Sequence, residues 1–80
     1  MALRRVRLTF PETLIREPII WQLGHAFKVV TNIRMADIDN TVGWVMLELE
    51  GEDDEIDRSL AWAESKGLRV DPVAGDVVEG

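Results

Sequence analysis

The fold is decided by the stretch Val29-Val30-Thr31-Asn32-Ile33-Arg34-Met35-Ala36-Asp37, which a short polar connection joins to a second strand-like run, Trp44-Val45-Met46-Leu47-Glu48-Leu49-Glu50. Successive side chains of a β-strand lie on opposite faces. One face of the two runs is therefore apolar and is expected to be core, with Val29, Thr31, Ile33, Met35, Val45, Leu47 and Leu49. The opposite face mixes apolar, polar and charged side chains, so we look for function there.

The connection between the runs contains Asp39, Asn40 and Gly43, residue types that favour turns. We therefore expect a β-hairpin. The segment Asp37-Ile38-Asp39-Asn40 also resembles the start of a calcium loop, but it lacks the glycine and the final bidentate glutamate of that motif. A hairpin turn is the better interpretation.

The composition is that of one small globular domain. The 80 residues are 46% hydrophobic and 30% charged, which argues against disorder. A chain this short buries roughly 60% of the surface that it exposes when unfolded, so it has room for a single core. No apolar run approaches the roughly 20 residues that span a bilayer, and the N-terminus has no signal-peptide pattern. We expect a cytoplasmic protein with no membrane insertion.

Charge and cysteine content exclude several classes of site. The net charge of −6 disfavours a nucleic-acid binder, because phosphate binding needs clustered positive charge. The absence of cysteine removes disulfides, thiolate catalysis and iron–sulfur ligation by this chain. The sequence contains no phosphate loop, dinucleotide fingerprint, metal-ligand pair or nucleophile with an activating base. We therefore expect a protein that is not an enzyme and that binds no cofactor and no metal ion.

The segment before the hairpin predicts a strand followed by a helix. Apolar and polar side chains alternate from Val6 to Phe10, and Pro11 ends this strand. A helix is expected to begin at Pro18, which suits a first helical turn. Its expected buried stripe is Ile20, Leu23 and Phe27, with Ile19 and Ala26 beside it. Gly24 inside this helix costs stability relative to alanine, which either a close approach to the sheet or neutral drift would explain.

The segment after the hairpin repeats this order. An acidic cluster from Glu50 to Asp57 opens a second helix, where carboxylates interact favourably with the macrodipole. The expected buried stripe of this helix is Ile56, Leu60 and Ala63, and Lys66-Gly67 ends it. Residues 68–71 predict a short last strand, which Pro72 ends.

The order strand, helix, strand, strand, helix, strand predicts an α+β, ferredoxin-like βαββαβ fold. Right-handed crossovers place both helices on one face of a four-stranded antiparallel sheet of order 4-1-3-2. The helix-facing side is then expected to carry Val6, Leu8, Phe10, Ile33, Met35, Val45, Leu47, Leu49, Leu68 and Val70. We expect one domain over residues 3–73 and a loose C-terminal tail over residues 74–80, in which Val77-Val78 could add a short edge pairing.

The central stretch resembles a known family. Thr31-Asn32-Ile33-Arg34 is similar to the Asn-Ile-Leu signature of the NIL domain, with Asn32 and Ile33 matching and Arg34 in place of the leucine. Other similar motifs follow in the family's order, namely Arg5-Val6-Arg7-Leu8-Thr9-Phe10, Pro18-Ile19-Ile20, Gly43 at the onset of the third strand, and Leu49-Glu50-Gly51 before an acidic helix start. The resemblance covers residues 3–73.

The resemblance implies a non-enzymatic regulatory module. NIL domains occur as the C-terminal regulatory domain of the ATPase of methionine ABC importers, where they bind methionine and inhibit transport, and before ferredoxin domains in some iron–sulfur proteins. They are similar to ACT domains and often pair through their sheets. The chain looks like a freestanding NIL protein that senses methionine or a related sulfur amino acid. The alternative is a ligand-free adaptor that docks on a transporter ATPase or an iron–sulfur protein.

The sheet face away from the helices, called the open face below, carries the candidate binding residues Asn32, Arg34, Trp44, Met46, Glu48 and Arg7. An arginine can hold a carboxylate, Glu48 can take an ammonium, and Trp44 with Met46 offers a wall that suits a thioether. The same face can form a homodimer centred on Trp44 and Met46. It can also be a solvated surface on which Arg34, Glu48 and Arg7 form cross-strand ion pairs. These uses are compatible, because a ligand site can lie at a dimer interface.

Trp21 and Trp62 fall outside the buried stripes of their helices and are candidates for a protein-partner surface. The alternative is that each ring lies half-buried over the edge of its helix. His25, the only histidine, follows Trp21 by four residues and is expected to stack on that indole at the surface.

Overall fold

The structure is a computed structural model that describes residues 1–73, so the predicted tail over residues 74–80 and its Val77-Val78 pairing lie outside the described residues. The elements in chain order are β1 (Ala2–Phe10), a 3-10 turn (Glu12–Leu14), α1 (Ile19–Ala26), β2 (Val29–Ile38), β3 (Gly43–Gly51), α2 (Asp53–Lys66) and β4 (Arg69–Pro72). The predicted α+β element order is confirmed. Within residues 1–73, no helix has the length and apolarity that crossing a bilayer requires.

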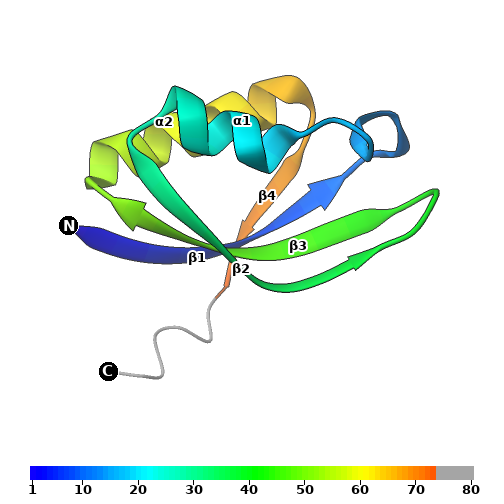
Figure 1. Ribbon diagram of the computed structural model, residues 1–80, viewed down its shortest axis with the longest axis horizontal. Helices are drawn as coiled ribbons and strands as arrows, with labels where there is room; N and C mark the ends of the chain where they lie inside the picture. The colour runs from blue at the N-terminus through cyan, green and yellow to red at the C-terminus, as the bar shows by residue number, and fades with distance from the viewer. Residues whose placement is uncertain (74–80) are drawn as a thin grey trace.

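The four strands form one antiparallel sheet of order β2-β3-β1-β4, which is the predicted order 4-1-3-2. Figure 1 shows both helices on one face of this sheet, with the turn end of the β2–β3 hairpin extending beyond them. The long strands β1 and β3 lie in the middle and pair along their whole lengths, from Ala2 opposite Gly51 to Phe10 opposite Gly43. The fold is therefore the predicted ferredoxin-like arrangement with one covered face.

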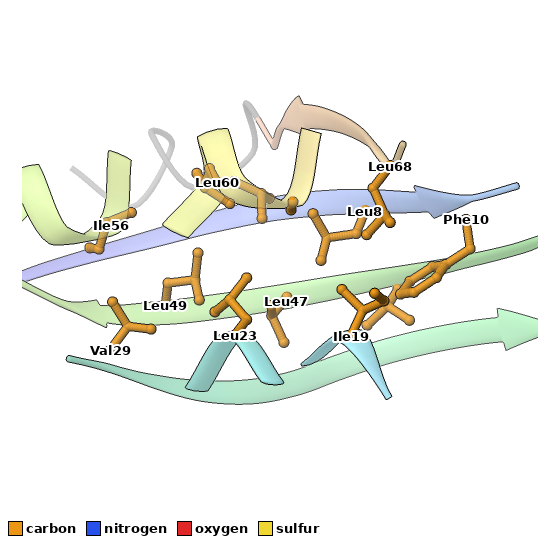
Figure 2. Packing of buried hydrophobic residues seen from close by; sticks show 13 residues of the cluster. Leu8, Phe10, Ile19, Leu23, Val29, Leu47, Leu49, Ile56, Leu60 and Leu68 are labelled. Atoms are coloured by element: carbon orange, nitrogen blue, oxygen red, sulfur yellow. The ribbon is translucent and has the colours of Figure 1, made fainter. Parts of the chain in front are cut away.

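The core lies between the helices and the sheet (Figure 2). Its buried members are Val6, Leu8, Phe10, Ile19, Leu23, Val29, Val45, Leu47, Leu49, Ile56, Leu60, Ala63 and Leu68. Each of the fully buried leucines and isoleucines stabilises the fold by about 1.5–3 kcal/mol relative to an exposed position. The predicted stripe of α2 is confirmed, since Ile56, Leu60 and Ala63 are all buried.

The buried stripe of α1 differs from the predicted one. Ile19 and Leu23, one turn apart, are buried, whereas Ile20 and Phe27 are only half-buried and Ala26 is exposed. The helix begins directly after Pro18, so Ile19 occupies its first turn and faces the sheet. The predicted burial of Leu23 is confirmed, but Ile19 takes the buried position that was predicted for Ile20.

The outer half of β2 also departs from the prediction, which placed Ile33 and Met35 together in the core. A β-bulge interrupts the pairing, so that Ile33 lies opposite Leu47 while Met35 lies opposite Met46. One extra residue in a strand moves every later side chain to the other face. Met35 consequently lies on the open face, and Ile33 stays on the helix side but beyond the helices, with exposed fractions of 56% and 54%.

The acidic cluster at the start of α2 has structural partners. Arg4 on β1 donates hydrogen bonds to Asp57 (2.6 Å) and to Asp53 (3.1 Å). Glu55 accepts the backbone N–H of Lys28 at 2.9 Å, which joins the start of α2 to the end of α1. These contacts fix the first turns of α2 over the sheet, so the acidic residues are explained without a bound cation.

Two glycines make a matched test of packing. A Cβ at Gly51 would lie 2.8 Å from the backbone oxygen of Lys28, whereas a Cβ at Gly24 would lie 3.8 Å from Thr31. Close approach therefore explains Gly51 but not Gly24. We expect Gly51→Ala to lower the free energy of unfolding by about 1–3 kcal/mol through overpacking, and Gly24→Ala to raise it by about 1 kcal/mol through helix propensity. Urea unfolding followed by circular dichroism measures both, and a neutral Gly51→Ala would contradict the close approach.

Candidate functional site

The open face is organised around Glu48, whose side chain is only 14% exposed. Glu48 accepts a hydrogen bond from Arg5 at 2.8 Å. On its other side the guanidinium of Arg34 approaches to 3.8 Å, and Asn32 is its direct partner across the β2–β3 ladder. Of the ion pairs predicted among Arg34, Glu48 and Arg7, the one between Arg34 and Glu48 is present, but Arg5 and not Arg7 is the main partner of Glu48.

These cations change the acidity of Glu48. The hydrogen bond from Arg5 holds the pKa of Glu48 below its usual value, the loss of solvent opposes this shift, and the charge of Arg34 adds to it. Glu48 is therefore ionised at neutral pH and already paired with two arginines. An ammonium group of a ligand would have to compete with them.

The remaining open-face candidates form a second contact. The guanidinium of Arg7 lies 5.2 Å from the ring centroid of Trp44, within the range of a cation–π interaction. Met46 lies opposite Arg7 on β1 and opposite Met35 on β2. The structure thus brings all six predicted open-face residues onto one surface and adds Met35 to it.

The two tryptophans on the helical side differ in exposure. Trp21 is 62% exposed and stacks on His25 with ring centroids 3.9 Å apart, which confirms the predicted stacking. Trp62 is half-buried against the core, where it contacts Phe27 at a centroid distance of 6.1 Å. Only Trp21 therefore presents most of its surface to a partner.

A groove that the sequence did not reveal lies on the helix side, between the start of α1 and the outer half of the β2–β3 hairpin. Its volume is about 220 Å³. Phe10 and Val45 belong to its inner wall, while Trp21, Ile33 and Ile38 form parts that are also exposed to solvent. Phe10 and Ile19, which both line the groove, lie near each other at one end of the core (Figure 2). The groove is therefore an uncovered extension of the core.

The residues of the groove carried a weak signal in the sequence. Ile38, which lines the groove, lies at the start of the hairpin turn, where a solvated turn needs no large apolar side chain, and it is 52% exposed. The turn itself is held by Asp39, which accepts the backbone N–H groups of Thr41 and Val42 at 2.8 and 2.9 Å. Asp39 therefore acts as a turn residue. Within residues 1–73, no three side chains of the metal-binding types gather into a cation site.

A comparison with protein families decides the identity of the domain. The family model of the NIL domain matches residues 4–72. The chain belongs to the NIL domain family. Asn32 and Ile33 of the NIL signature lie on β2 directly before the bulge, and Arg34, which replaces the leucine, reaches across the open face to Glu48.

A solved structure shares the fold of this NIL domain. It is the C-terminal domain of an ABC transporter ATP-binding protein from Enterococcus faecalis, with a TM-score of 0.79 and 20% sequence identity. The match covers 89% of this chain and 83% of that chain. A search among curated proteins gave no match. The likeness confirms the ferredoxin-like fold.

The pairing of Glu48 predicts a pH-dependent contribution to stability. Because the folded-state pKa lies below the ordinary value of 4.5, the contribution is complete above about pH 4.5 and is lost as the pH falls through the folded-state pKa. We expect Glu48→Gln to lower the Tm at pH 7 and to match the wild type at low pH.

Glu50→Gln is the control for this prediction, since Glu50 is exposed on the same strand and has no ion pair in the described part of the chain. It removes the same charge without breaking a pair, so its Tm should stay near that of the wild type. Thermal unfolding between pH 3 and pH 8 measures all three proteins. Equal Tm values for Glu48→Gln and Glu50→Gln at pH 7 would contradict the stabilising role of the pair.

Proposed function

We propose that this NIL domain is a non-enzymatic, cytoplasmic regulatory module that binds methionine or a related sulfur amino acid. The observation that carries the proposal is the family match over residues 4–72. The fold that it shares with the C-terminal domain of an ABC transporter ATP-binding protein supports the proposal. A homodimer that pairs two open faces, with the half-buried Trp44 and Met46 at its centre, is part of this proposal.

The chemistry of the described surfaces suits a thioether ligand. Thioethers make favourable contacts with aromatic and apolar side chains, and one indole lies on each of the two candidate surfaces: Trp44 on the open face and Trp21 at the groove. On the open face, Arg34, whose side chain is half exposed, offers a partner for the carboxylate of an amino acid.

Isothermal titration calorimetry with L-methionine tests this function. We expect saturable heat with a dissociation constant between micromolar and millimolar, and much weaker binding of L-glutamine, which has a similar length but a polar amide end. Absence of binding heat with millimolar L-methionine would contradict the proposed ligand-sensing function.

A second candidate is an adaptor that docks on a transporter ATP-binding subunit or a ferredoxin without a ligand. The observation that favours it is Trp21, which is 62% exposed, since tryptophan is enriched among the residues that contribute most to protein interfaces.

The adaptor is tested by sedimentation velocity with the purified partner. Trp21→Ala is expected to weaken binding by about tenfold or more. Val30→Ala is the matched control, because Val30 is also 62% exposed but lies on β2, away from the groove. Equal partner binding by the two variants would show that Trp21 is not part of the interface.

A further inference from the structure

The two edges of the sheet are protected unequally. The edge strand β4 has only four residues, ends at Pro72 and carries an ion pair between Arg69 and Asp71 at 3.0 Å. Short length, proline and charged side chains are devices that prevent another chain from pairing with a sheet edge. The edge strand β2 has ten residues and contains neither proline nor lysine, and within residues 1–73 no further strand pairs along its outer side. β2 is therefore the edge that is open to strand addition.

The β-bulge interrupts this edge without closing it. It lies between Ile33 and Met35, and regular pairing with β3 continues over Met35–Ile38, called the outer segment below. All residues of the outer segment are exposed, and it leads to the hairpin turn that extends beyond the helices (Figure 1). The backbone N–H and C=O groups on its outer side can pair with an extended segment of another chain, the mode of recognition called β-augmentation.

The groove beside α1 opens along the same part of β2. Ile33, Ala36 and Ile38 line it from the strand, and Trp21 lines it from α1. Large apolar side chains exposed singly are ordinary, but a contiguous group around a concavity marks an interaction site. An apolar cavity of about 150 Å³ takes up benzene, and pockets for drug-sized molecules begin at about 300 Å³. The groove, at about 220 Å³, therefore suits one large apolar side chain of an added strand.

The two faces of the outer segment differ in chemistry. Ile38 lines the groove on the helix side, whereas Asp37 lies opposite Trp44 on the open face. Side chains that lie opposite each other on neighbouring strands share a face, and successive side chains of one strand alternate between faces. A strand added beside β2 therefore directs alternate side chains to the groove and to Asp37.

The charge around this end of the molecule is negative. Residues 11–18 and 35–43 carry one arginine, Arg16, and four exposed carboxylates: Glu12, Glu17, Asp37 and Asp39. Like charges that face each other across a ladder destabilise the pairing, and opposite charges stabilise it. A second copy of the chain, with a net charge of −6 and the same carboxylates, is repelled here, whereas a basic segment is attracted.

We propose that the outer segment of β2 is a strand-addition site for a basic, extended segment of a partner protein. The partner segment alternates apolar and basic residues: one large apolar side chain enters the groove, and a lysine or arginine lies beside Asp37 on the other face. The inference rests on the adaptor function, the second candidate above, and names the chemistry of its partner. It does not depend on the binding of methionine.

Synthetic peptides test the site. The basic peptide is Lys-Val-Lys-Leu-Lys-Val-Lys with blocked ends, and the acidic peptide has glutamate in place of each lysine. Each is titrated into the ¹⁵N-labelled protein and followed by ¹H–¹⁵N NMR, in which the backbone amides of Met35–Ile38 and the indole N–H of Trp21 report on the site. Two further forms of the basic peptide are N-methylated, one at the lysines and one at the apolar residues, because only one of these sets of N–H groups faces β2 in a paired strand.

We expect the basic peptide to shift the resonances of Met35–Ile38 and of the Trp21 indole, and the acidic peptide to bind about tenfold or more weakly. One N-methylated form should lose binding and the other should keep it. Asp37→Lys should weaken binding of the basic peptide by about tenfold or more and strengthen binding of the acidic one. Asp54→Lys is the matched control, because Asp54 is exposed and without an ion pair within the described residues but lies on α2.

The groove is tested by a second pair of variants. Ile33→Ser removes an apolar side chain from the groove wall and should weaken binding of the basic peptide several-fold. Val30→Ser is its control, because Val30 is 62% exposed on the same strand but lies before the bulge and outside the groove. Spectral dispersion and Tm verify that each variant folds.

Each other outcome is decisive. If the basic peptide leaves the amides of Met35–Ile38 unshifted, or if both N-methylated forms bind equally, strand addition is overturned, and Trp21-dependent binding of a purified partner would still support the adaptor function. If the peptide binds as expected but the purified transporter subunit or ferredoxin does not, the site stands and the adaptor function toward those partners falls. If these amides shift with the concentration of the protein itself and the basic peptide does not compete, a second copy occupies the edge and the proposal is overturned.

Discussion

The short helix α1 is the constraint on which the surfaces of this domain depend. Its eight residues rise about 12 Å, whereas the ten residues of β2 extend over about 33 Å. Because β2 is an edge strand, no neighbouring element within residues 1–73 replaces the missing cover over its outer half. Only Val29 of β2 is buried, and the core opens into a groove at the end where Phe10 and Ile19 meet. The groove is a direct geometric result of unequal element lengths.

The bulge in β2 divides one apolar strand between two surfaces. Ile33 and Ile38 line the groove on the helix side, and Met35 lies on the open face beside Met46. A regular strand would have put Ile33 and Met35 on the same side. The NIL signature residues Asn32 and Ile33 directly precede this irregularity, so the family motif lies at the position where the strand changes its facing.

The two surfaces differ in their electrostatics. On the open face, Glu48 is paired with Arg5 and Arg34, and Arg7 lies over Trp44, so that surface is satisfied by its own residues. The groove offers an apolar hollow and the single carboxylate of Glu17. Surface ion pairs contribute little to stability, but they occupy the groups that a ligand would use. The open face is therefore polar and paired among its own residues, whereas the lining of the groove is mainly apolar.

The sequence by itself determined the element order, the sheet order, the stripe of α2, the turn at Asp39 and the NIL resemblance, because each depends on local residue types and their spacing. The rotation of α1 and the facing of Met35 were decided only by the tertiary structure. Alternation along a strand predicts faces only while pairing continues without interruption, and the bulge depends on how β2 and β3 align. The groove likewise could not be predicted from one segment. It depends on how far the eight residues of α1 extend over the ten residues of β2.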